Sequence, residues 1–209
     1  MISRSILLDE HNITRHDYGG KVETDCEKFI GGLIELFDDL ADFALSRIYK
    51  QLYNANSNFD VDTLPKEDVD HFKLTWYVSL AELMFFSMTD QPKLEEIKEA
   101  FYDEMEITAQ ERNASPFLIE SRASIPKIIN RYRDFVERGL FNAPMSNRED
   151  DAPRNRGLGP ELANVILEAS FATNPIVGPV FDEILETFEL EFNNAYGHCS
   201  IACSTFIVV

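Results

Sequence analysis

The chain has few cysteines, few basic residues and no long apolar run, and each shortage excludes a class of protein. Three cysteines (Cys26, Cys199 and Cys203) in 209 residues cannot all pair, which excludes a disulfide framework. The 19 Lys and Arg against 37 Asp and Glu give a net charge of −18, which argues against nucleic acid or an anionic membrane as the main partner. No apolar stretch reaches the roughly 20 residues of a membrane helix or the about 7–15 of a secretory signal. We therefore expect a soluble cytoplasmic protein with reduced thiols.

The chain nevertheless has enough hydrophobic residues to form a packed core, since they make up 44% of it. Apolar residues recur at spacings of three and four through most of the chain, which is typical of helices buried on one face. We expect an all-α fold, a single-domain bundle of about six helices. Residues 1–20 are predicted to be irregular, 21–196 to form the bundle and 197–209 to be an apolar C-terminal tail. Proline and charge predict a long loop at 142–158.

Several boundaries can be assigned in more detail. Thr24 and Glu27 have the form of a capping box at the start of the first helix. The helix predicted at 65–88 is apolar almost all round in its second half, which is typical of a central helix. Pro126 predicts a break between two short helices, since a proline inside a helix costs about 3 kcal/mol. The last helix is predicted to end near Gly197.

The most specific motif is Asp38-Asp39-Leu40-Ala41-Asp42. It resembles the DDxxD motif of class I terpene synthases and prenyltransferases, which are also all-helical. The resemblance implies Mg²⁺ held by Asp38, Asp39 and Asp42 against the diphosphate of an isoprenoid substrate. Carboxylates at i and i+4 share a helix face, and Mg²⁺ takes oxygen ligands. At about 100° per residue, these carboxylates point away from the apolar stripe of their own helix.

The helix that carries this motif has an acidic face. No Lys or Arg lies three or four residues from its carboxylates, which are Glu35, Asp38, Asp39 and Asp42. Further acidic runs lie at 95–106 and 182–191. Uncompensated acidic faces suit a basic protein partner, because long-range electrostatics steers such a partner toward them. These four residues are therefore candidate partner-binding residues, and the alternative is that the charges serve solubility alone.

Basic residues are clustered as well. Five of them lie within 17 positions: Arg122, Lys127, Arg131, Arg133 and Arg138. One interpretation is pairing with an acidic helix of the same molecule or of a second copy, and the interpretation we favour is an exposed amphipathic helix. Phe is abundant, with 16 residues, and Phe-rich helices can bury against a twin. A homodimer is therefore expected.

The predicted central helix carries a narrow polar line. Spacings of 3, 4, 4 and 3 place its members on one side of the helix: Asp68, His71, Thr75, Ser79 and Glu82. If this side borders a cavity, Glu82 is a desolvated carboxylate and a candidate general acid or base. If it faces water, it is the wet edge of a buried helix, which is the reading we favour.

The C-terminal tail ends in four apolar residues, Phe206, Ile207, Val208 and Val209. An apolar segment of this kind tends to associate with other apolar surfaces when it is exposed to solvent. We expect it to dock onto the bundle. The alternatives are strand addition to a partner and presentation of the peptide for recognition or modification.

Our first functional hypothesis is an acidic helical protein that acts by protein–protein binding, as an inhibitor, immunity-type factor, adaptor or assembly subunit, with no cofactor. Its partner is a basic protein or a second copy. The alternative is an all-α enzyme with a bundle cavity, using Mg²⁺ through Asp38, Asp39 and Asp42 or acid–base chemistry through Glu82. A second alternative is a helical leader domain that presents its C-terminal peptide. A cavity bordered by the carboxylates favours the enzyme, and a filled core with the acids outside favours the binder.

Overall fold

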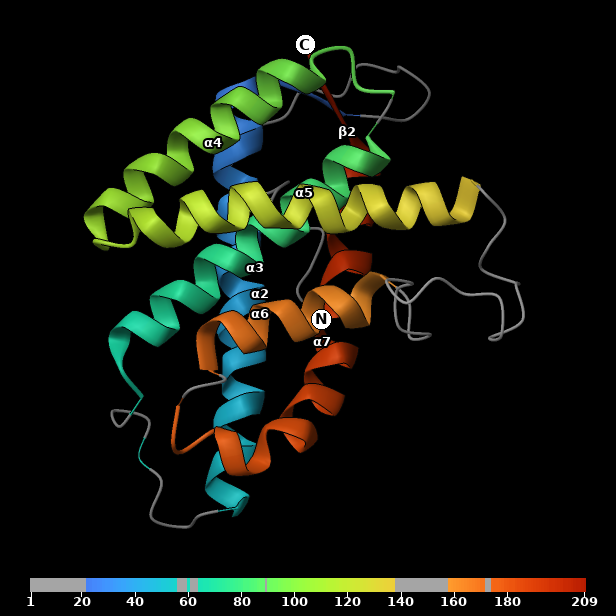
Figure 1. The fold of residues 1–209 in the computed structure, drawn as a ribbon. Helices are drawn as coiled ribbons and strands as arrows, with labels where there is room; N and C mark the ends of the chain where they lie inside the picture. The colour runs from blue at the N-terminus through green and yellow to red at the C-terminus, as the bar shows by residue number, and fades with distance from the viewer. Residues whose placement is uncertain (1–21, 56–59, 61–63, 89, 138–157, 172–173) are drawn as a thin grey trace.

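One buried helix, α3 (Lys66–Ser87), is the centre of the computed structural model (Figure 1). It contacts each of the five other described α-helices. From Phe72 to Phe85 nearly every side chain is buried, as the run of apolar residues around the whole helix predicts. The predicted central position of this helix is therefore confirmed.

The structure describes residues 22–55, 60, 64–88, 90–137, 158–171 and 174–209, with the backbone alone at 132–137, 160 and 202. Six α-helices lie in these ranges: α2 (Cys26–Ala55), α3, α4 (Leu94–Glu111), α5 (Ser115–Glu137), α6 (Leu158–Phe171) and α7 (Phe181–Thr205). A 3₁₀ turn, η4 (Gly178–Val180), precedes α7. The predicted all-α bundle of about six helices is confirmed. The predicted irregular segment 1–20 and the loop 142–158, apart from Leu158, lie outside the described residues.

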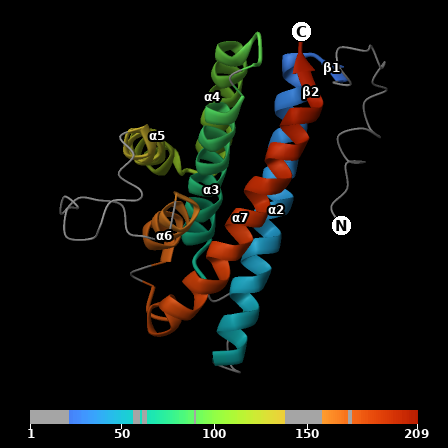
Figure 2. The same ribbon diagram turned by 90° about the vertical axis from the view of Figure 1, so that its right-hand side faces the viewer.

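The helices are arranged on two sides of α3. On one side, α2 and α7 lie next to each other and run in opposite directions (Figure 2). On the other side, α5 and α6 cross α3 at a steep angle (Figure 2). Helix α4 runs beside α3 (Figure 2) and also contacts α2. Among the helices that the structure describes, none combines the length and apolarity needed to span a membrane.

Aromatic rings fill the middle of this arrangement. Trp76 and Phe72 of α3 contact Phe188 at ring-centroid distances of 5.5 and 5.4 Å. Phe192 of α7 and Phe171 of α6 join the same cluster. Because these rings are fully buried and contact one another, the centre of the described bundle is filled by side chains.

A short parallel pair of strands joins the two ends of the described chain. β1 (Val22–Thr24) pairs with β2 (Phe206–Val208), with Val22 opposite Phe206. The side chain of Gln91, 7% exposed, binds β2 in addition: its Nε2 donates to the Phe206 carbonyl at 2.6 Å, and its Oε1 accepts from the Val208 N–H at 3.2 Å. The side chains of Phe206 and Val208 are buried, so the tail docks onto the bundle as expected.

Two predicted helix ends are wrong. Helix α7 does not end near Gly197 but continues to Thr205. The reason is that the buried stripe continues past the glycine through Cys199 and Cys203, and packing outweighs the roughly 1 kcal/mol helix cost of one glycine. Helix α5 likewise runs through Pro126 without the predicted break.

Burial on both sides of the proline explains the second difference. Ile125 and Ile129 flank Pro126 and are both buried, so breaking the helix there would remove one of them from the core. At the start of α2 the N-cap is Asp25 rather than Thr24, because the Asp25 Oδ1 accepts the Lys28 N–H at 2.8 Å while Thr24 belongs to β1.

Gln91→Ala tests the role of this side chain in holding β2. The substitution leaves the Phe206 carbonyl and the Val208 N–H without their side-chain partner, so we expect a loss of about 2 kcal/mol in unfolding free energy. Urea denaturation measures the loss, and faster hydrogen exchange of the Val208 amide localises it to β2. Gln110→Ala, at an exposed glutamine, is the matched control. A Gln91→Ala variant with wild-type stability and exchange would contradict this role.

Candidate functional site

Two of the three aspartates of the DDxxD motif, Asp38 and Asp42, bind a lysine of the central helix. The Lys73 ammonium on α3 donates to Asp38 Oδ1 at 2.8 Å and lies 2.7 Å from Asp42 Oδ1. The i, i+4 spacing places both carboxylates on the side of α2 that meets α3. The Lys73 side chain is only 14% exposed, so this ion pair lies at a helix–helix contact rather than free in solvent.

The same cluster extends to α4. The Tyr77 hydroxyl donates to Asp38, and Arg112, just after α4, pairs with Asp70 of α3 at 3.5 Å. Burial raises the pKa of Asp38, but the hydrogen bonds from Lys73 and Tyr77 and the nearby positive charges lower it more, so its pKa is below the usual value. Burial and the Asp38 carboxylate raise the pKa of Tyr77. The cluster therefore ties α2, α3 and α4 together through ion pairs and a hydrogen bond.

Asp39 points away from the apolar stripe of α2 into solvent, whereas Asp38 and Asp42 point away from that stripe but toward α3. Asp39 is exposed, as predicted. Asp38 and Asp42 also lie off the apolar stripe of α2, yet they face Lys73, which no pattern near them in the sequence indicates. A Mg²⁺ ion between these two carboxylates would have to displace the Lys73 ammonium. In the described residues, no group of three or more His, Cys, Asp or Glu is placed to hold a metal ion.

An acidic and aromatic line remains exposed on α2. Glu35, Asp39 and Phe43 are four residues apart, so they lie along one face of the helix. Phe43 is 43% exposed, and the guanidinium of Arg47 lies 5.1 Å from the centre of its ring. We call Glu35, Asp39 and Phe43 the α2 line. It combines two exposed carboxylates with an exposed apolar ring.

Neighbouring helices cover most of the polar line on α3: α5 packs against His71 and Thr75, and α4 against Glu82. Thr75 and Ser121 share a hydrogen bond of 3.1 Å between their buried hydroxyls. His71 stacks on Phe117 with ring centroids 3.9 Å apart. The preferred wet-edge interpretation is wrong for Thr75 and Ser79, which are at most 2% exposed and whose hydroxyls form hydrogen bonds within the protein.

Glu82, the candidate general acid or base, lies at the contact of α3 with α4. It is partly buried and accepts a hydrogen bond from the Tyr102 hydroxyl. The guanidinium of Arg122 lies 4.2 Å from the centre of the Tyr102 ring and pairs with Glu106 at 3.1 Å. Glu82 therefore belongs to a network of contacts that joins α3, α4 and α5.

The basic cluster pairs with acids of the same molecule where the structure describes it. Arg122 pairs with Glu106 of α4, and Arg131 pairs with Glu161 of α6. The alternative of pairing within the molecule therefore holds for these two residues, rather than the favoured interpretation of an unpaired exposed face. The side chains of Arg133 and Arg138 lie outside the described residues.

The four candidate partner-binding residues of the tail differ in their exposure to solvent. Phe206 and Val208 point into the bundle, Ile207 is partly buried and Val209 is 55% exposed. The first two are therefore available to a partner only if β2 leaves β1 and Gln91. Gln91 itself was not indicated by the sequence, because its role depends on a contact with residues more than a hundred positions away.

Comparisons of the chain with protein-family models, with curated proteins and with solved structures found no match. The candidate sites are therefore judged on their geometry alone.

Lys73→Met tests the cluster on α2 and α3. Two carboxylates lose their cation, and because both are more than one-third exposed, we expect a loss of only about 1 kcal/mol in unfolding free energy at pH 7. The lowered pKa of Asp38 means that its contribution is present above its unfolded pKa of roughly 3.9 and is lost as the pH falls through the folded value.

The stability of wild type should therefore fall more steeply than that of Lys73→Met on acidification below about pH 4. Chemical denaturation across this range measures the difference. Lys50→Met, which removes an exposed cation of α2, is the control and should have little effect. Equal effects of the two substitutions would show that Lys73 contributes only through net charge.

Proposed function

We propose that this protein acts by binding a basic protein partner, and that the α2 line is its main contact. The observation that carries the proposal is the exposed row of Glu35, Asp39 and Phe43. Two carboxylates provide steering toward a cationic surface, and an exposed aromatic ring beside them provides apolar contact area. A basic segment with an apolar side chain fits both features.

The distribution of charge over the molecule supports this choice. Most of the described cations already have carboxylate partners within the chain, for example Lys73, Arg112 and Arg122. Exposed carboxylates without a described ion pair lie on every described α-helix, for example Glu67 on α3, Glu120 on α5 and Glu168 on α6. Three helices carry groups of them: Glu35 and Asp39 on α2, Glu99, Asp103 and Glu104 on α4, and Asp182, Glu183 and Glu186 on α7. The surplus of negative charge is thus carried on the surface. Among these faces, that of α2 is the one that also presents Phe43.

The filled centre of the bundle also favours binding over catalysis. Aromatic rings occupy the space between α3, α6 and α7, where the enzyme alternative requires a substrate cavity. The carboxylates of that alternative are engaged with Lys73 and Tyr102 instead. These observations support a protein whose surface, rather than its interior, carries the function.

We place this binding in the cytoplasm. Cys26, Cys199 and Cys203 are all free thiols, which suits a reducing compartment. A homodimer is a separate proposal for the same surface, and light scattering of the purified protein distinguishes it. Like charges on two copies of the α2 line repel, so we expect the basic partner to compete successfully with a second copy.

Affinity capture from the native source with paired variants tests the proposal. We expect wild type to retain a basic protein at physiological ionic strength and to release it at higher salt. Glu35→Gln/Asp39→Asn should weaken the affinity by roughly five- to tenfold. Phe43→Ala should weaken it by about tenfold, as expected of an aromatic anchor. The dissociation constant of the captured partner, measured with each purified variant, gives these changes in affinity.

The charge-matched control is Glu99→Gln/Asp103→Asn on α4, with Tyr53→Ala as the control for loss of an exposed aromatic ring of α2. Both controls should bind like wild type. If the α4 pair weakens binding as much as the α2 pair, then net charge rather than the α2 line attracts the partner. If no basic protein is retained, the proposed function is wrong.

Titration with Mg²⁺ separates the binder from the metal-dependent enzyme. Because the Lys73 ammonium lies between Asp38 and Asp42, we expect Mg²⁺ to shift the melting temperature no more than an equal ionic strength of NaCl does. A specific site would stabilise the folded protein by mass action at micromolar to low-millimolar metal. A shift in that range that disappears in Asp38→Asn/Asp42→Asn would establish the enzyme alternative.

A further inference from the structure

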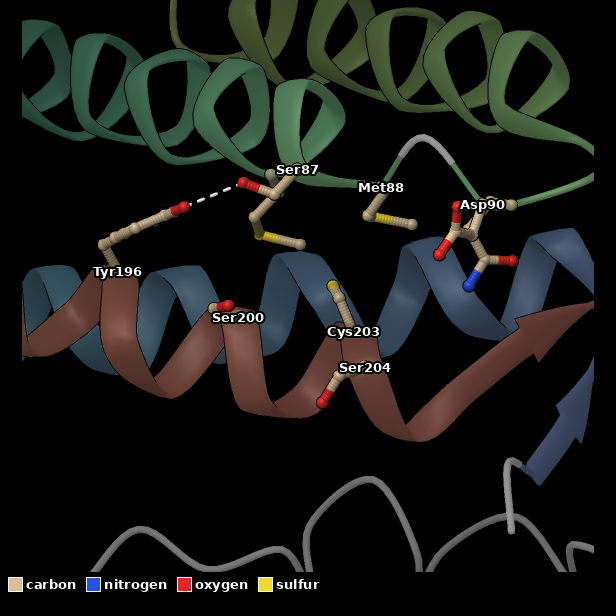
Figure 3. A pocket seen from close by; sticks show the side chains of 9 residues that line it. Ser87, Met88, Asp90, Tyr196, Ser200, Cys203 and Ser204 are labelled. Carbon is tan, nitrogen blue, oxygen red and sulfur yellow. Dashed lines mark hydrogen bonds between the residues drawn. The ribbon is translucent and has the colours of Figure 1, made fainter. Parts of the chain in front are cut away.

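A small hollow lies between the end of α3 and the last turns of α7 (Figure 3). Its volume is about 150 Å³. Three sulfur-bearing side chains line it: Met84, Met88 and Cys203. Hydroxyl groups lie near it too, and the Ser87 hydroxyl is 2.8 Å from that of Tyr196. The hollow is separate from the α2 line and takes no part in the proposed binding of a basic protein.

The sulfur atoms come from two helices that face each other. Met84 and Met88 are one helical turn apart, so their side chains lie on the same side of the end of α3. Cys203 approaches from α7, and in Figure 3 the side chains of Met88 and Cys203 point toward each other across the space between the helices. All three residues are at most 6% exposed.

The Cys203 thiol has no hydrogen-bond partner among the described residues. It is 5% exposed and lines the hollow, so a sulfur atom that can bind a metal ion is buried there without a hydrogen bond. Two thioethers beside a thiol form a soft donor set, which prefers Cu(I) over hard cations such as Mg²⁺. A donor set of this kind, next to a space that can admit an ion, has the composition of a soft-metal site.

We propose that this hollow binds a soft monovalent cation, Cu(I), through the Cys203 sulfur and the thioether sulfurs of Met84 and Met88. On binding, the S–H bond of Cys203 breaks, a sulfur–metal bond forms and one proton leaves to solvent, with no change of oxidation state. Burial raises the pKa of Cys203, with a smaller contribution from Cys199, so the thiol is protonated before the metal arrives. Asp90 and Tyr196 are the other titratable groups that line the hollow.

The site would connect the metal to the C-terminal strand. Gln91 also lines the hollow and holds β2 through Phe206 and Val208. A metal that joins the end of α3 to the last turn of α7 brings together the two elements next to this glutamine. Slower exchange of the Val208 amide on metal binding is therefore a readout that adventitious binding elsewhere does not give.

Titration with Ag⁺, a redox-stable soft cation, tests the site in the full chain. The experiment uses Cys26→Ser in chloride-free buffer, because Cys26 is a partly exposed thiol that would bind Ag⁺ by itself. We expect one Ag⁺ per chain, one proton released, a higher melting temperature and slower exchange at Val208. Cu(I) under a reducing atmosphere should compete for the same site.

Matched variants in the same background assign the ligands. Met84→Leu/Met88→Leu conserves volume and should lower Ag⁺ affinity by at least about tenfold, whereas Met105→Leu, at a buried methionine of α4, should not. Cys203→Ala should abolish binding and Cys199→Ala should retain it. Circular dichroism of each metal-free variant verifies its fold. Absence of binding in Cys26→Ser, or binding that survives the loss of both methionines or of Cys203, would overturn the proposal.

Discussion

The fold depends on the burial of one helix on all its sides. The second half of α3 is apolar around nearly its whole circumference, so it is stable only when other helices cover it completely. Its few polar groups are accommodated by partners at the contacts: Thr75 by Ser121, Asp70 by Arg112 and Lys73 by two aspartates. Every neighbouring helix is positioned by its contact with α3, and the aromatic cluster around Trp76 fills the remaining space.

The large negative charge is compatible with this fold because attraction is concentrated at helix contacts and repulsion is left in solvent. Lys73 and Arg112 meet carboxylates between α2, α3 and α4, where water shields the charges less than on the open surface. Glu35 and Asp39 lie in water, where salt screens them. The same separation leaves the surface acidic enough to steer a cationic partner while the helix contacts remain neutralised.

The two proposals assign different tasks to different ends of the molecule. The α2 line is an exposed surface, and its partner is recognised by charge and by an aromatic contact. The hollow beside Cys203 is an interior site formed by the last turns of α7 and the end of α3, next to the residues that hold β2. Binding at the α2 line requires a complementary partner surface, whereas metal binding in the hollow requires sulfur ligands placed around one ion. Either proposal can therefore hold without the other.

The sequence by itself indicated the helical class, the central position of α3, the docking of the tail and the exposure of Asp39, because each depends on where apolar residues lie along the chain. Only the tertiary structure decided which distant residues these side chains contact. Lys73 lies 35 residues from Asp38, and Gln91 lies 115 from Phe206. Packing likewise overrode the local signals of Gly197 and Pro126, since burial of the flanking residues outweighs the helix preference of one residue. Local patterns specify which faces are buried, whereas contacts between distant segments specify what those faces meet.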